Sequence, residues 1–184
     1  MKTKNLTISA IFTALTAVFA QLIIPLPFTP VPFSMAVFAV YLTGALLPPG
    51  WAAGAQAAYL LIGAAGLPVF GQFTGGAGVL AGPTGGYLLS YPIMSLLVAA
   101  LARLTSRKTW PVLAAGMLCA LAVCYAGGSF WYCAVAGVAW SRSAELTILP
   151  FLPFDLLKIA VCAPFASALN RSLKKAHLLP DQNT

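Results

Sequence analysis

Two side chains of opposite charge, Asp155 and Lys158, lie three residues apart in an apolar stretch near the C-terminus. Each costs about 2.5–3.5 kcal/mol at the centre of a membrane helix, so such residues usually face a partner or a cavity. Their spacing places both on one helix face. We interpret them as a binding site, in which Lys158 holds an acid group and Asp155 accepts a hydrogen bond from a ring N–H. The alternative is a mutually neutralising pair that only helps the helix to pack.

A glycine-rich stretch between residues 66 and 87 supplies the second set of candidate contacts. Its glycines allow the backbone to approach a ligand closely. A helix that begins at Thr84 would offer the positive end of its dipole to a carboxylate. Phe73 and Tyr87 could pack on the ligand or serve ordinary packing. No Lys follows these glycines in the spacing of a Walker A motif, so we do not expect the chain to hydrolyse ATP itself.

The composition places these residues in a membrane protein. Of the 184 residues, 60% are hydrophobic and only 7% are charged, whereas soluble domains are about 25% charged. The net charge of +7 does not indicate nucleic-acid binding, because the basic residues lie at the ends of apolar runs. The four cysteines form no CxxC pair, and the single histidine, His177, lies in the tail. We therefore predict no metal site, no redox site and no enzyme.

Six apolar runs are long enough, or nearly so, to cross a hydrocarbon core of ~30 Å as helices. Pro48, Pro49 and Gly50 separate the second run from the third. We predict an all-α fold with one domain over residues 1–184, an integral membrane bundle of six transmembrane helices with an outward-facing substrate pocket. A cleaved signal peptide is the alternative for the first run. The predicted spans are Leu6–Ile24, Phe33–Leu47, Trp51–Gly66, Thr84–Ala102, Trp110–Ala126 and Leu149–Leu169.

The basic residues predict the orientation of this bundle. If both termini are cytoplasmic, eight of the ten Lys and Arg residues fall on the cytoplasmic side, as the positive-inside rule requires. The outer connections are then residues 25–32, which contain four prolines, residues 67–83 and residues 127–148. Asp155 lies one to two turns below the outer end of the last span, as the floor of an outward pocket would.

The first span carries small residues at helical spacing: Ala10, Thr13, Ala14 and Ala17. In lipid, such stripes allow two helices to approach closely. The spacing alone leaves open whether the second helix belongs to this chain or to another subunit.

Several of these stretches together resemble the BioY family, the biotin-binding membrane subunits (S components) of energy-coupling factor (ECF) vitamin transporters. The resemblance covers nearly the whole chain. It departs from the family at Gln72-Phe73, where two glycines are often found, and at Ala36, where Gln is often found. The stretches that carry it are GLPVF at 66–70, GPTGGY at 82–87, PFDLLK at 153–158 and the proline-rich connection at 25–32.

The resemblance implies capture of biotin from outside, with Asp155 and Lys158 as polar contacts. It implies that Ala10 and Ala14 dock on the ECF transmembrane coupling subunit, and that two cytoplasmic ATPase subunits drive transport. It also implies a multi-pass protein of a prokaryotic cell membrane, with biotin as transported ligand, no cofactor and no nucleic-acid partner. The loop residues expected to close over the ring system are Gln72, Phe73, Thr74, Gly75 and Gly76.

The residues also allow a stand-alone secondary transporter, in which Asp155 carries a coupling proton and Lys158 is its counter-charge. Uptake that needs no ATPase partner and stops when the proton gradient collapses would favour that alternative. Another vitamin with an acid group is a second alternative, because the pair alone does not select biotin.

Overall fold

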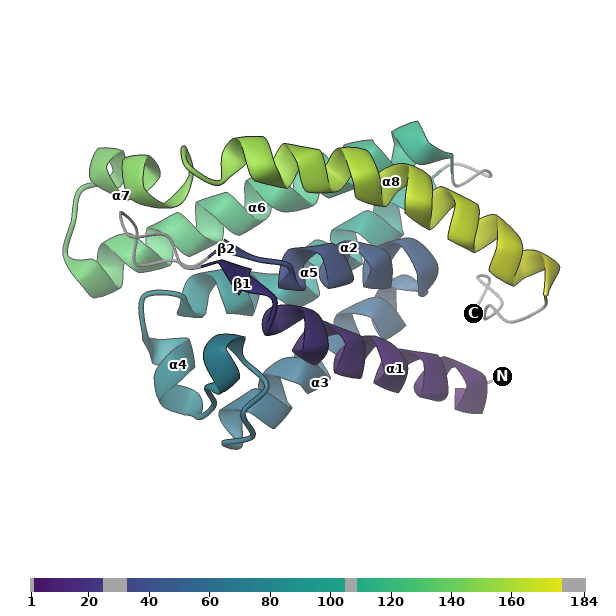
Figure 1. Cartoon of the computed structure of the whole chain (residues 1–184), viewed down its shortest axis with the longest axis horizontal. Coiled ribbons are helices and arrows are strands. Elements are labelled where there is room, and N and C mark those ends of the chain that lie inside the picture. Colours follow the sequence, from purple (N-terminus) through teal and green to yellow (C-terminus); the bar gives the residue numbers. More distant parts are fainter. Residues whose placement is uncertain (1, 25–32, 105–108, 177–184) are drawn as a thin grey trace.

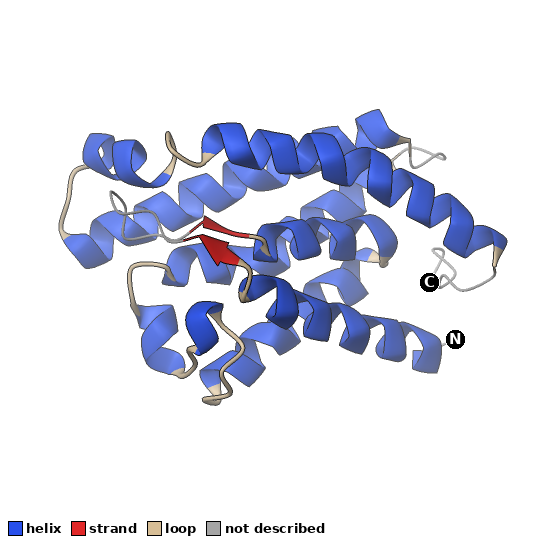
Figure 2. Cartoon of the chain, in the orientation of Figure 1, coloured by secondary structure: helices blue, strands red, loops and turns tan. Residues whose placement is uncertain are grey.

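The computed structural model describes residues 2–24, 33–104 and 109–176, and helices dominate these ranges (Figure 1). Figure 2 shows the helices side by side, with one small pair of strands among them. The helices are α1 (Lys2–Ala20), α2 (Ala36–Leu46), α3 (Pro49–Ala64), α4 (Ala77–Ala81), α5 (Gly85–Arg103), α6 (Trp110–Ala136), α7 (Trp140–Thr147) and α8 (Leu152–Lys175). The strands β1 (Ile23–Ile24) and β2 (Phe33–Ser34) pair antiparallel, and η1 (Gly71–Phe73) is a 3-10 turn.

Each of the six predicted spans overlaps one helix: α1, α2, α3, α5, α6 and α8. Four of them, α1, α5, α6 and α8, are long and apolar enough to cross a membrane, whereas α2 has 11 residues and α3 has 16. The predicted all-α membrane bundle is confirmed. Pro49 lies in the first turn of α3, where its missing N–H breaks no helical hydrogen bond.

The prediction for the end of α6 was wrong. We expected this span to end at Ala126 and residues 127–148 to form an outer loop, but α6 continues to Ala136 and α7 follows it. Gly128 lies inside the helix and serves packing, since a Cβ there would lie 2.2 Å from the Tyr87 ring. The helix ends at Gly137, whose left-handed conformation (φ 65°) is typical of a C-terminal cap.

The glycine-rich connection, predicted as a loop, contains η1 and α4. Within η1, Gln72 and Phe73 adopt φ values of 58° and 54°, a left-handed conformation that costs free energy in residues other than glycine. The side chain of Gln21 holds this turn from both sides. Its Nε2 donates to Phe70 O at 3.0 Å, and its Oε1 accepts from the Phe73 N–H at 2.9 Å. These bonds tie the turn to the end of α1.

α5 lies at the centre of the bundle and packs against α2, α3 and α6, while α8 packs against α6 and α2 (Figure 1). The approach of α2 to α5 is close at Gly44, where a Cβ would lie 2.6 Å from Ser95 O. The first residues of α5 and α8, the strand β2 and the end of α7 meet at one end of this packing.

The beginning of α1 and the end of α8 lie together at the opposite end of the bundle (Figure 1). This arrangement agrees with an even number of crossings. The proline-rich connection at 25–32, together with Arg107, Lys108 and His177, lies outside the described residues.

Candidate ligand-binding site

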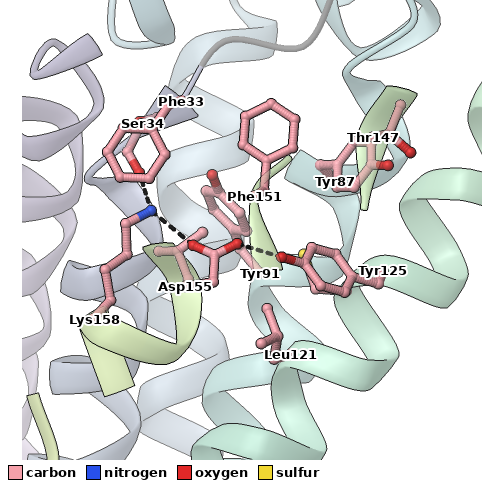
Figure 3. A pocket seen from close by; sticks show the side chains of 12 residues that line it. Phe33, Ser34, Tyr87, Tyr91, Leu121, Tyr125, Thr147, Phe151, Asp155 and Lys158 are labelled. Atoms are coloured by element: carbon pink, nitrogen blue, oxygen red, sulfur yellow. Dashed lines mark hydrogen bonds and ion pairs between the residues drawn. The ribbon is translucent and has the colours of Figure 1, made fainter. Parts of the chain in front are cut away.

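Asp155 and Lys158 form a buried ion pair in the first two turns of α8. Lys158 Nζ lies 2.8 Å from Asp155 Oδ1, and the side chains are only 8% and 7% exposed. The predicted helical spacing therefore brings the two charges together on one face (Figure 3). Because both charges are removed from water, each needs further polar partners to be tolerated.

Those partners come from two other elements. Lys158 Nζ also donates to Ser34 O of β2 at 2.7 Å, and it lies 3.9 Å from the centroid of the Phe33 ring, a cation–π distance. The Tyr125 hydroxyl of α6 donates to Asp155 Oδ2 at 2.6 Å. The pair is thus satisfied by β2 on one side and α6 on the other, and it holds these elements to α8.

A cavity opens beside the pair and has about 490 Å³ of empty space, counting the space at its mouth. β2, α2, α5, α6, α7 and α8 all contribute to its lining. Its walls are mostly aromatic and apolar, which is typical of small-molecule sites with a few placed polar groups. The aromatic residues that line it are Phe33, Tyr87, Tyr91, Tyr125 and Phe151.

A second polar group lies on another wall of the cavity. The Tyr87 hydroxyl is 3.2 Å from Ser129 Oγ, which is 3.1 Å from Thr147 Oγ1, and Thr147 Oγ1 donates to Ser143 O at 2.9 Å. Tyr87 and Thr147 line the cavity, whereas Ser129 is fully buried behind them. In Figure 3, Tyr87 and Thr147 lie across the cavity from Lys158.

Three of the predicted contact residues, Asp155, Lys158 and Tyr87, meet in this cavity. Thr84 is placed differently: it is the residue before α5, its carbonyl accepts from the N–H groups of Tyr87 and Leu88, and it does not line the cavity. Within the described part of the chain, no three His, Cys, Asp or Glu side chains gather as a metal site would need.

The predicted loop contacts lie apart from the cavity. Gln72, Phe73 and Thr74 are exposed, Gly75 and Gly76 are partly buried, and none of the five lines the cavity. Phe73 is 73% exposed. A contact between this loop and a ligand stays a prediction.

The small-residue stripe of α1 divides between two faces. Thr13 faces α3, where its Oγ1 donates to Ala55 O at 2.9 Å. Ala10 and Ala14 are exposed, and they lie on the same side as the exposed Leu6. The exposed half of the stripe is free to meet another helix.

Tyr125, Ser129 and Thr147 were not predicted as site residues from the sequence. Each is a hydroxyl residue in or next to an apolar run, where such residues often bond to their own helix. Tyr125 and Ser129 are four residues apart and therefore share a face of α6. That spacing was a usable signal, but residues 127–148 were assigned to a loop, so Ser129 and Thr147 were not placed beside the pair.

Comparison with known proteins gives one consistent result. The model of the BioY family matches residues 1–175. A protein of Thermotoga maritima named biotin transporter BioY is 40% identical over 166 residues, which cover 89% of this chain and 94% of that protein. Biotin transporter BioY2 of Lactococcus lactis is 33% identical and covers 94% of this chain and 93% of its own.

A solved structure agrees with the sequence relatives. The crystal structure of the S-component for biotin from an ECF-type ABC transporter superposes with a TM-score of 0.83 and 27% identity, over 95% of this chain and 92% of that one. The relatives are transporters rather than enzymes. With a family match over almost its entire length, the chain belongs to the BioY family.

Proposed function

We propose that this chain is the biotin-binding membrane subunit of an ECF-type transporter. The observation that carries the proposal is the buried Asp155–Lys158 pair on the wall of a cavity, in a chain that is similar to biotin S-components. With the termini in the cytoplasm, the cavity lies at the outer end of the bundle, where it can capture biotin from outside.

The charge of the pair decides which end of biotin it suits. Asp155 and Lys158 neutralise each other, so a ligand carboxylate against Lys158 would place an uncompensated negative charge beside Asp155. The cyclic urea of biotin is neutral, donates two N–H groups and accepts at its oxygen. Asp155 keeps free lone pairs for the N–H groups, and Lys158 has a third N–H for the urea oxygen. We infer that the urea ring binds to both residues, whereas the sequence alone suggested the acid group at Lys158 and a ring N–H only at Asp155.

Energy for transport comes from other subunits in this proposal. The sequence contains no Walker A motif, so a coupling subunit and two ATPase subunits would supply ATP hydrolysis. The exposed residues Ala10 and Ala14 on α1 form the docking face for the coupling subunit. Biotin then leaves on the cytoplasmic side when the bundle reorients.

A large charged side chain introduced into the docking face should block assembly of the complex. Ala14→Arg is expected to prevent assembly with the coupling subunit and to leave biotin affinity unchanged, because Ala14 is exposed and remote from the cavity lining. Co-purification of the complex and a biotin titration of the isolated chain measure the two effects. Ala160→Arg, at an exposed position of α8 away from the cavity lining, is the matched control. Equal assembly of the Ala14→Arg variant would place docking elsewhere.

The proposed ligand is tested by titrating the detergent-purified chain with biotin, dethiobiotin and riboflavin. Biotin should bind tightest, dethiobiotin should bind measurably because it keeps the urea, and riboflavin should not bind. Equal affinity for riboflavin, or no binding of biotin, would remove the proposal.

A further inference from the structure

The hydroxyl groups of Tyr87, Ser129 and Thr147 form a chain whose direction is fixed. Thr147 Oγ1 donates its one proton to Ser143 O, since a carbonyl can only accept. Ser129 must therefore donate to Thr147, and Tyr87 must donate to Ser129. Tyr87 and Thr147 both line the cavity, but the Thr147 proton is already donated to Ser143 O. The Tyr87 proton is therefore the one that can turn toward a ligand.

This hydroxyl chain lies nearer the outer end of the bundle than the ion pair does. Tyr125, which bonds to Asp155, and Ser129, which bonds to Tyr87, are successive residues on one face of α6. Four residues separate them, a rise of about 6 Å along the helix axis. Since α6 runs outward in the proposed orientation, the hydroxyl chain is the shallower of the two polar groups in the cavity.

Packing holds the Tyr87 ring in place. The ring lies against Gly128 of α6, and a Cβ added at residue 128 would be only 2.2 Å from the ring. Trp131 holds the connection between α4 and α5, which precedes Tyr87, because its Nε1 donates to Gly82 O at 3.0 Å. Tyr87 also lies in the first turn of α5, where the helix dipole favours negative charge.

We propose that the hydroxyl chain of Tyr87, Ser129 and Thr147 is a second polar subsite, which binds the carboxylate of the ligand through the Tyr87 hydroxyl. The assignment rests on the proposed function and deepens it. It separates the two polar ends of biotin: the neutral urea lies at the neutral ion pair, and the acid lies one turn closer to water. When the Tyr87 hydroxyl turns from Ser129 to the ligand carboxylate, it exchanges a neutral hydrogen bond for a charge-assisted one, which is roughly twice as strong.

The subsite is tested by comparing biotin with biotinamide, which has the same rings but no charge. The wild-type chain should bind biotin roughly tenfold more tightly than biotinamide, as expected for a hydrogen bond to a charged group. In Tyr87→Phe, which keeps the packed ring, biotin affinity should fall roughly tenfold and the preference should shrink to within about threefold of equality. Tyr132→Phe, on α6 but away from the cavity lining, is the matched control and should keep the wild-type preference.

Two results would overturn the subsite while the proposed function stands: equal wild-type affinity for biotin and biotinamide, or an unchanged preference in Tyr87→Phe. The first of these needs no variant, so it decides the matter even if Tyr87→Phe does not fold. Failure of the wild-type chain to bind either compound would remove the proposed function, and the subsite with it.

Discussion

Lys158→Ala is expected to weaken biotin binding by roughly 2–5 kcal/mol, the range for losing one partner of a buried charge pair. This corresponds to a loss of affinity from roughly thirtyfold to several thousandfold. The physical reason is that Asp155 would remain buried, with the Tyr125 hydroxyl as its remaining side-chain donor. The same variant should destabilise the fold by about 3–5 kcal/mol. Biotin titration and thermal unfolding in detergent measure the two effects.

The chain offers a matched control for this prediction. Arg142 and Glu145 form a second ion pair with the same i,i+3 spacing and a 3.0 Å distance, but their side chains are 62% and 56% exposed. Arg142→Ala should therefore change stability by less than about 1 kcal/mol and should not change biotin affinity. If Lys158→Ala behaved like Arg142→Ala, the burial of the Asp155–Lys158 pair would have no energetic consequence, and the site assignment would fail.

Gly85→Ala is expected to reduce stability by more than about 3 kcal/mol, above the usual cost of overpacking a core. A Cβ at this position would lie 1.7 Å from Leu80 O and 3.1 Å from Trp131 Nε1. Leu80 O is a backbone atom, so no side-chain rotation relieves the clash, and α4 must move away from the start of α5. The yield of monodisperse protein in size-exclusion chromatography and the thermal midpoint measure this loss.

Gly54→Ala is the control for the glycine prediction. No atom outside the helix lies within 4 Å of a Cβ built there, and Gly54 lies inside α3. The extra methyl group should leave the thermal midpoint unchanged or raise it, because alanine favours a helix over glycine by about 0.5–1 kcal/mol. A similar loss in both variants would show that any added methyl group, rather than the contact between α4 and α5, lowers the stability.

Much of the fold could be predicted because the bilayer imposes it. Apolar run lengths located the helices, and proline and glycine at 48–50 located the break between α2 and α3. The spacing of Asp155 and Lys158 predicted their contact, since three residues along a helix bring two side chains to one face. These properties are local, because each depends only on residues that are close together in the sequence.

The rest depended on contacts between distant segments. The packing role of Gly128 inside α6 follows only from the position of the Tyr87 ring, which lies against it. The partners of the ion pair, Ser34 and Tyr125, lie 124 and 30 residues from the atoms they contact. No periodicity within one helix fixes its rotation relative to another, so these contacts follow only from the packed bundle. The turn that contains Gln72 is similarly held by hydrogen bonds from the distant side chain of Gln21 to Phe70 and Phe73.

The central claim is that the buried pair is kept for the ligand rather than for the fold, and removing both charges together tests it most directly. Replacing a buried ion pair by apolar residues is often neutral or stabilising. The double variant Asp155→Leu, Lys158→Met should therefore unfold within about 5 °C of the wild-type midpoint, a change of about 1.3–2.5 kcal/mol for a chain of this size. We predict that its affinity for biotin falls at least a hundredfold, or roughly 2.7 kcal/mol. A well-folded double variant that binds biotin within threefold of the wild type would contradict the account.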